Sequence, residues 1–400
     1  MGWIFLEAVD NWFFRDGAPF EAGDDHSATT LFPPTARTVQ GALRAKIWRR
    51  AQESTPPSSE LLCMVGNPDD VGSISAFGGP FTARRSKRTG QVECYFTPPQ
   101  DLVELVPAGD DLVSAPHRLV CAKPMPQGPD LPKLQSSIPG GLLSLWVQDT
   151  VFPARLSGDT YLVNDCVLQH ALQGNINLNK GRLTSTASLF ARERRAGNKL
   201  KKGSKNTEEG HLYEIELANP GRNGGWVTGL AVMCDGIDLP DDHDVVQLGG
   251  ESRWAVSYAI PDGCRLPDPP SFQVDDHGKT RFKLYLATPC CLSGGWLPNW
   301  LSKTSCGLVG EHPDLPGHPL HLVAAAIAPK TGIGGFRLVS KQSRGTDAAL
   351  GAGTVLFFET EAPPDEVVRL HGTYLREDTP LPQHENDTKL GFGLSFLGSW

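Results

Sequence analysis

The hydrophobic positions of the chain fall into short runs separated by polar stretches rich in proline and glycine. The first run spans residues 2–9 and is mostly apolar, with Trp3, Ile4, Phe5 and Leu6 in succession. Such a run is typical of a strand, and the polar stretch that follows cannot continue it. We therefore expect a strand to open the chain, at the edge of a buried sheet.

A helix is predicted directly after Pro33-Pro34. The prolines end the preceding extended segment, and Thr35 is a suitable N-cap. Beyond it, Val39, Leu43 and Ile47 recur every four residues, which places them on one buried face of a helix. The N-terminal part of the chain is thus expected to run from strand to loop to helix.

Further along, short apolar or alternating runs predict several strands with few helices between them. These runs are residues 92–96, 211–217, 228–233, 254–260, 282–287 and 355–359. The stretch at 98–139 is dense in proline and has little periodicity, so we expect an extended excursion over the surface. The 43 glycines and 33 prolines among 400 residues also favour short strands joined by turns. The predicted fold class is α+β with antiparallel sheets.

The net charge of −8 argues against a protein that coats nucleic acid nonspecifically. The basic residues are nevertheless concentrated in two clusters, one at 84–88 and one from Arg192 to Lys205 that is interrupted by a single acidic residue, Glu193. An acidic body with basic projections suits a subunit that binds a short stretch of RNA and otherwise contacts proteins. The alternative is that both clusters are solvated surface loops.

The predicted first helix carries Arg37 and Arg44 seven positions apart, on one flank. A helix start after a proline-containing loop offers free backbone N–H groups and the positive end of the helix dipole, and both favour a phosphate group. An ordinary solvated basic helix face is the alternative.

A glycine-rich run at 330–337 is followed by the basic residues Lys341 and Arg344. Glycine lets a backbone approach RNA closely and present its N–H groups. No Gly-Lys-Ser or Gly-Lys-Thr follows a strand here, so the run does not indicate nucleotide hydrolysis. We expect a loop that contacts phosphates.

Nine cysteines are scattered along the chain without a Cys-x-x-Cys pair. This spacing indicates neither a zinc ribbon nor a disulfide framework. Cys290 and Cys291 are adjacent, which is poor spacing for chelation of one ion. We expect no metal and no cofactor, and no apolar run reaches membrane-spanning length, so we expect a cytoplasmic protein.

The N-terminal block resembles the RAMP superfamily of CRISPR proteins and, more narrowly, the third subunit of the type III-B Cmr effector module. The blocks that carry the resemblance, in chain order, are Trp12, Phe14-Arg15-Asp16-Gly17, Pro19-Phe20, Phe32-Pro33-Pro34, Thr38-Val39, Gly41-Ala42-Leu43-Arg44, residues 210–214, 248–253, 335–340, 352–358 and Gly391-Phe392-Gly393. They extend over nearly the whole chain. Two stretches depart from the family pattern, 192–206 and 314–329.

The resemblance implies tandem ferredoxin-like (RRM-like) domains with long Gly/Pro-rich insertions, at residues 1–155 and 156–400. It implies a noncatalytic subunit that holds the 5′ repeat-derived tag of the crRNA and bridges the large polymerase-like subunit to the backbone filament. The implied partners are the crRNA tag, those two Cmr subunits and other RAMP subunits, with no membrane. The residues expected to contact RNA are Arg37, Arg44, Lys46, Gly334, Gly335, Lys341 and Arg344.

Two other functions stay open on the sequence. One is an endoribonuclease that processes CRISPR precursor RNA, with His26 as its general acid or base. The other is a purely structural bridge without RNA contacts. The polar groups at 241–244 and 275–277 combine aspartate with histidine, but by composition they are expected to be turns and not metal sites.

Overall fold

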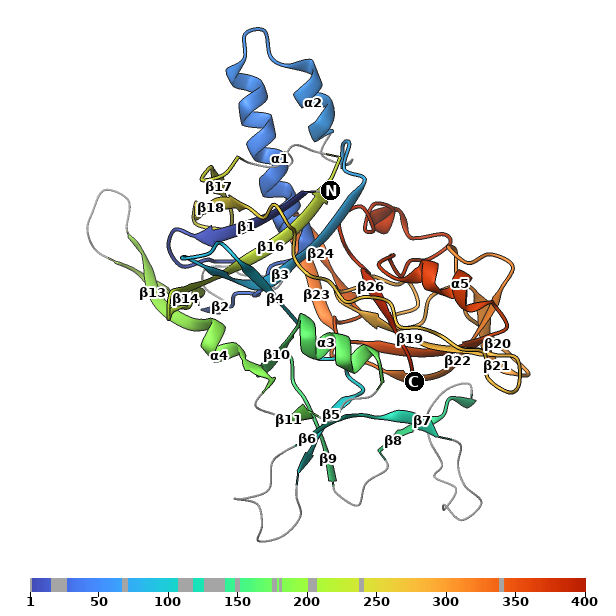
Figure 1. Cartoon of the computed structure of the whole chain (residues 1–400). Helices are drawn as coiled ribbons and strands as arrows, with labels where there is room; N and C mark the ends of the chain where they lie inside the picture. The colour runs from blue at the N-terminus through green and yellow to red at the C-terminus, as the bar shows by residue number, and fades with distance from the viewer. Residues whose placement is uncertain are drawn as a thin grey trace.

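The computed structural model describes most of the chain, and the ranges it describes are residues 2–15, 27–66, 71–106, 118–125, 141–147, 152–174, 178–179, 182–200, 207–236, 241–337 and 342–400. Two large antiparallel sheets dominate these ranges, with few helices (Figure 1). This arrangement confirms the predicted α+β class with antiparallel sheets. The tandem ferredoxin-like arrangement is a finer statement and stays a prediction.

The first sheet has nine strands and includes the N-terminal strand. Its order is β12 (Thr184–Ser185), β10 (Tyr161–Asn164), β4 (Val92–Phe96), β3 (Ala76–Ser86), β16 (Trp226–Asp235), β1 (Gly2–Ala8), β18 (Trp254–Ala259) and β17 (Val245–Gln247), and β15 (Arg222–Asn223) pairs with β16. Strands from both sides of residue 155 therefore share one sheet, and the proposed domain division stays a prediction.

Strand β1 lies inside this sheet, between β16 and β18, so the expected edge position was wrong. The reason lies in its apolar run, because a strand buried on both faces needs apolar side chains at consecutive positions. Ile4 and Leu6 pack into one hydrophobic cluster with Val39 and Leu43 of the first helix. Phe5 faces the opposite side and packs in a second cluster.

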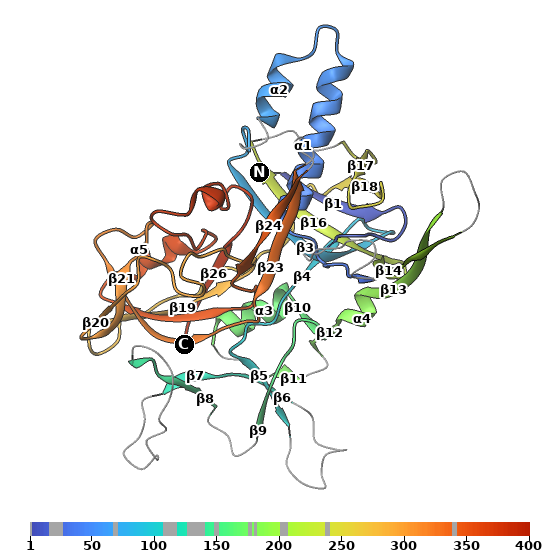
Figure 2. The ribbon, with the colours of Figure 1, turned by 180° about the vertical axis from the view of Figure 1, so that it is seen from behind.

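The second sheet has six strands and lies beside the first (Figures 1 and 2). Its order is β20 (Ser302–Thr304), β21 (Gly307–Glu311), β22 (Pro319–Ala326), β25 (Val355–Thr360), β19 (Thr280–Leu286) and β26 (Ser395–Gly398). Phe357 and Tyr285 from this sheet join Phe5 in one buried cluster. The two sheets are thus continuous through a common core.

Smaller sheets account for the remaining strands. They are β11 (Leu178–Asn179), β6 (Arg118–Cys121), β5 (Leu102–Val106) and β9 (Phe152–Arg155); β13 (Phe190–Leu200), β14 (Thr207–Pro220) and β2 (Ser27–Ala28); β23 (Thr331–Arg337) with β24 (Gln342–Ala349); and β7 (Lys123–Met125) with β8 (Ser144–Trp146). The described parts of 98–139 include the paired strands β5, β6 and β7, which the prediction of an extended excursion over the surface did not include. Among the described prolines, Pro98 and Pro99 precede β5, and Pro124 lies in β7 of a two-stranded sheet, where a missing N–H is tolerated.

The helices are α1 (Ala36–Glu53), α2 (Ser59–Val65), α3 (Asp165–Leu172), α4 (Thr186–Leu189) and α5 (Pro364–Val367), with 3₁₀ turns η4 (Val368–Leu370) and η5 (Pro382–His384). The predicted first helix is confirmed, and it buries Val39, Leu43 and Ile47 as expected. Figure 1 shows α1 and α2 projecting together from one end of the molecule, and the β13–β14 hairpin projecting from one side. No helix in the described ranges is both long and apolar enough to cross a membrane.

Candidate nucleic-acid interface

A cleft of about 790 Å³ opens beside the start of α1. Its walls include Pro33–Ala36 before and at the helix start, Gly79-Pro80 of β3, Thr331–Ile333 of β23, and Gly391-Phe392 near the C-terminus. Three motifs that are far apart in the sequence therefore meet at one surface: the Pro-Pro loop, the glycine-rich run and the C-terminal Gly-Phe-Gly. The hairpin of β23 and β24 extends alongside toward α1 in Figure 2.

The N-terminus of α1 forms part of this cleft wall. Thr35 occupies the N-cap position as predicted, but its side chain makes no cap hydrogen bond, and its hydroxyl lies 3.1 Å from that of Thr38. The first turn also contains no acidic residue. Because residues 33–36 line the cleft, the positive end of the helix dipole lies at its wall.

The charged side chains among the described lining residues are Arg155, Arg192 and Lys330, with Asp159 as the one carboxylate. Arg155 and Lys330 are exposed. The lining is therefore positive although the whole chain is acidic. Sequence reasoning missed Arg155, because a single arginine at the end of a short strand carries no pattern.

Arg37, in the first turn of α1, is mostly buried, with 15% of its side chain exposed. Its Nη2 donates to Oδ1 of Asp387 at 3.0 Å, and its guanidinium carbon lies 5.5 Å from the centre of the Phe392 ring. Its buried Nε has no hydrogen-bond partner within the described ranges. Arg37 thus stands directly behind the cleft wall and holds the C-terminal Gly-Phe-Gly against the helix.

Arg44 and Lys46 point to different neighbours. The Nε of Arg44 donates to the carbonyl of Val65 at the end of α2, at 2.7 Å. The Nζ of Lys46 lies 2.6 Å from Oδ1 of Asp244, which precedes β17. The three basic residues expected on α1 therefore do not converge on one point, and each has a partner within the chain. Their contact with RNA stays a prediction.

Gly334 and Gly335 lie within strand β23, so the expected loop is instead a strand. The register shifts between Ile333 and Gly335, as in a β-bulge, and the backbone of Gly335 pairs with that of Arg344 in β24. Bulges commonly contain glycine, which explains why the run resembled a loop. Lys341 lies outside the described residues.

The part of the second basic cluster that the structure describes, residues 192–200, lies in strand β13 of a long hairpin, and Lys201, Lys202 and Lys205 lie outside the described residues. Arg192 pairs with Glu216, Arg194 with Glu214 at 3.5 Å, and Arg195 with Glu193 at 2.7 Å. These glutamates, two of them on β14, offset much of the positive charge, and the hydrogen bond from Arg195 leads the interactions that lower the pKa of Glu193. Sequence reasoning missed the compensation by Glu214 and Glu216, because they become neighbours of the arginines only when the hairpin forms.

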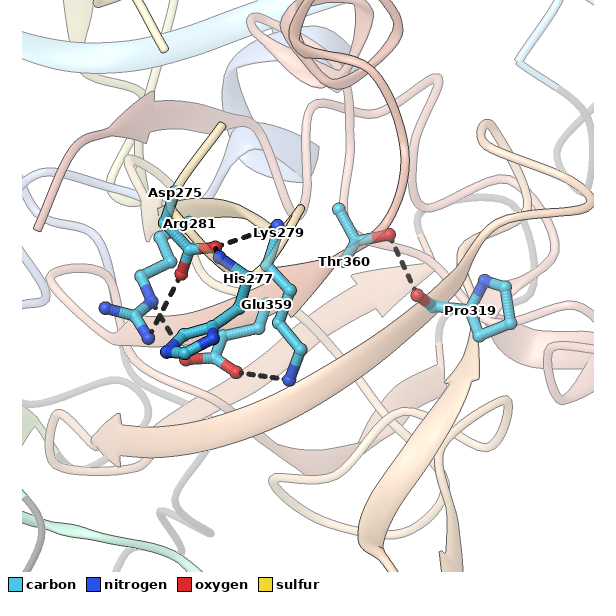
Figure 3. A network of polar contacts seen from close by, with 7 residues as sticks. All are labelled: Asp275, His277, Lys279, Arg281, Pro319, Glu359 and Thr360. Atoms are coloured by element: carbon cyan, nitrogen blue, oxygen red, sulfur yellow. Dashed lines mark hydrogen bonds and ion pairs between the residues drawn. The ribbon is translucent and has the colours of Figure 1, made fainter. Parts of the chain in front are cut away.

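The two aspartate-histidine groups are turns, as expected. Figure 3 shows that Asp275 accepts hydrogen bonds from the backbone N–H groups of His277 and Lys279, both at 2.9 Å. Beside this turn, Glu359 pairs with Lys279 at 3.1 Å and with Arg281 at 3.0 Å. In the other group, Asp244 accepts from the N–H of Val245. His26, the candidate general acid or base, lies outside the described residues.

Comparison with known proteins gives one match over nearly the full length. The family model described as "CRISPR-associated protein (Cas_Cmr3)" matches residues 4–400. No curated protein matches the sequence.

Two solved structures are distantly similar in fold. A chain of the type III-B Cmr-beta complex bound to cognate target RNA and AMPPnP (state 1) shares 13% identity, with a TM-score of 0.45 over 89% of this chain and 86% of that chain. A chain of the same complex bound to cognate target RNA shares 12% identity, with a TM-score of 0.43 over the same shares.

Proposed function

Because the chain belongs to the Cas_Cmr3 family of CRISPR-associated proteins, we propose that it is the noncatalytic subunit of a type III-B effector that holds the 5′ tag of the crRNA. The family match confirms the resemblance found in the sequence. Bridging between the large polymerase-like subunit and the backbone filament belongs to the same proposal.

The observation that supports tag binding most directly is the cleft beside α1. It combines a helix start without a side-chain cap, glycines that let a chain approach the backbone, and the exposed cations Arg155 and Lys330. Single-stranded RNA is bound by phosphate contacts to such groups, together with stacking on aromatic rings. Phe32 and Phe392 line the same cleft, but both rings are buried, so the cleft offers a short tag phosphate contacts and no free aromatic face from these two residues.

The proposal is tested on the complex purified gently from its native host. Mass spectrometry should find other RAMP subunits, and small-RNA sequencing should find RNAs that share one repeat-derived 5′ end. Reconstitution with 4-thiouridine in the tag should then crosslink those nucleotides to peptides from 31–36, 155–159 or 327–333. Crosslinks from the tag that all fall on other subunits would favour a purely structural bridge.

A cleavage assay with the free protein and a repeat hairpin RNA distinguishes the rival nuclease function from the proposed noncatalytic one. Cleavage that His26→Ala abolishes would establish processing activity and overturn the noncatalytic proposal. Uncleaved hairpin, with the tag crosslinks described above, is the result that the proposal requires.

A further inference from the structure

Three side chains of metal-ligating type converge beside Arg37. Cys291, His384 and Asp387 each offer one ligand atom, and these atoms lie within 4.8 Å of one another. His384 and Asp387 are buried, and Cys291 is half-buried. We call these three residues the thiol cluster. They come from two segments that are far apart in the sequence, so spacing along the chain could not have revealed them.

The histidine and the aspartate are fixed by their own loop, residues 382–393. The Nδ1 of His384 lies 2.8 Å from Oδ2 of Asp387. The N–H of Asp387 donates to the carbonyl of His384 at 3.0 Å, and the N–H of Phe392 donates to the carbonyl of Asp387 at 3.0 Å. The loop thus holds both ligand groups in place through its own backbone hydrogen bonds.

The segment that carries the cysteine is bonded to the same loop. The N–H of Gly393 donates to the carbonyl of Pro289 at 2.8 Å, two residues before Cys291. Cys290 exchanges two backbone hydrogen bonds with Leu350, at 3.0 and 2.8 Å. These bonds hold the thiol beside the loop by backbone contacts alone. Such pre-organisation is what a bound ion requires of its ligands.

We propose that the thiol cluster is a zinc site, with Sγ of Cys291, Nδ1 of His384 and Oδ2 of Asp387 as its three protein ligands. Sulfur, imidazole nitrogen and carboxylate oxygen are the donors that Zn²⁺ takes, and three protein ligands leave a fourth position for water or a partner's group. The thiolate excludes Mg²⁺ and Ca²⁺, which prefer all-oxygen sites.

The surrounding groups match what metal ligands need. The other ring nitrogen of His384, Nε2, lies 3.9 Å from Oδ2 of Asp347 in β24. This distance is too long for a hydrogen bond, and zinc at Nδ1 would leave the ring proton on Nε2, on the side of Asp347. The other oxygen of Asp387 accepts from Arg37. Oδ2 of Asp387 would therefore bind the ion while Oδ1 stays bonded to Arg37.

A bound ion would join the loop at 382–393 to the segment that carries Cys291 and so stiffen the cleft wall at Phe392.

The test is a Zn²⁺ titration of the full-length chain after treatment with a chelator, in competition with a chromophoric zinc indicator. We expect one Zn²⁺ per chain. Cys291→Ser should weaken binding at least about 100-fold, because it removes the thiolate ligand. Cys306→Ser is the matched control, because Cys306 is an exposed thiol in the β20–β21 turn, and it should bind as the unmodified chain does.

Two results would overturn the site: a chain that takes up no stoichiometric zinc, or a folded Cys291→Ser variant with unchanged affinity. Where that variant does not fold, Co²⁺ added to the unmodified chain decides. A thiolate-to-cobalt charge-transfer band in the near ultraviolet supports the site if Cys306→Ser retains it, and absence of the band rules out ligation by Cys291.

Discussion

Arg37 and Asp387 lie 350 positions apart in the sequence and form an ion pair, with Nη2 and Oδ1 separated by 3.0 Å. Only 15% and 9% of their side chains are exposed, so the pair is shielded from water and salt. It connects the first turn of α1 to the loop at 382–393, and thereby joins the two ends of the chain at the cleft.

A double-mutant cycle measures this connection. Arg37→Gln and Asp387→Asn should each lower the free energy of unfolding by about 1 to 3 kcal/mol, since each leaves a partly buried charge without its partner. The double variant should lose less than the sum, by at least about 0.5 kcal/mol. Urea denaturation in the presence of a chelator gives the values, and strictly additive losses would show that the pair is not coupled.

Neutralisation of the cleft's positive charge should weaken RNA binding. Arg155→Gln with Lys330→Gln should lower the affinity for single-stranded tag RNA and reduce the slope of log K against log salt by about 0.7 for each phosphate that the protein no longer neutralises. Lys303→Gln is the control, because Lys303 is an exposed lysine in the edge strand β20. Equal affinities and slopes for all three proteins in filter-binding assays would remove the cleft from the RNA site.

The free energy of unfolding should fall when one member of the buried pair Lys283 and Asp101 is replaced. Their side chains are 1% and 0% exposed, and the Nζ of Lys283 also donates to the carbonyl of Ala171 at 2.9 Å. Lys283→Met should cost about 3 to 5 kcal/mol, because Asp101 is left as an uncompensated buried charge. The double variant with Asp101→Leu should recover part of that loss in urea denaturation, and no recovery would contradict this account.

Gly391 should not tolerate a side chain. Its φ of 90° lies in the region that favours glycine, and a Cβ there would approach the carbonyl oxygen of Phe77 to 2.6 Å. Gly372, with a φ of 75° and open space around it, provides the matched control. Gly372→Ala should cost about 1 kcal/mol from backbone strain alone. Gly391→Ala should lower the melting temperature distinctly further, and equal melting temperatures would argue against the close contact.

Stability should fall in mild acid through His312. Burial lowers the pKa of this ring from 6.5 to about 4, so the folded protein keeps it neutral where the unfolded chain protonates it. The contribution of the neutral His312 ring to the free energy of unfolding is complete above about pH 6.5. This contribution is lost as the pH falls toward 4, by about 1.4 kcal/mol per pH unit. Between pH 7 and pH 5 the unmodified protein should therefore lose about 2 kcal/mol more than His312→Gln.

Urea denaturation at both pH values measures this difference. His277→Gln, a change at an exposed histidine, should follow the unmodified protein. A parallel pH dependence in His312→Gln would assign the acid sensitivity to other groups.

The sequence was most informative where a local pattern decides the structure. The spacing of Val39, Leu43 and Ile47 predicted α1 and its buried face, since a helical period needs no distant partner. The position of β1 inside its sheet was missed, because strand order depends on β16 and β18, which no local pattern specifies.

The candidate site was predictable only in part. The Pro-Pro loop, the glycine-rich run and the C-terminal Gly-Phe-Gly were all singled out from the sequence, and the cleft brings them together. The partners of Arg37 and Lys46 were not foreseeable, because Asp387 and Asp244 lie hundreds of positions away. The sequence identifies the charged residues that are expected to form ion pairs, but the fold determines which residue each of them pairs with.

The interior position of β1 also has a consequence during synthesis. Both of its neighbours, β16 and β18, are translated more than 200 residues after it. At roughly 5 to 20 residues per second, Ile4, Phe5 and Leu6 would wait about 10 to 40 s for their pairing strands. During that interval the ribosome carries an unpaired apolar strand, which makes the nascent chain a substrate for chaperones before it can join any complex.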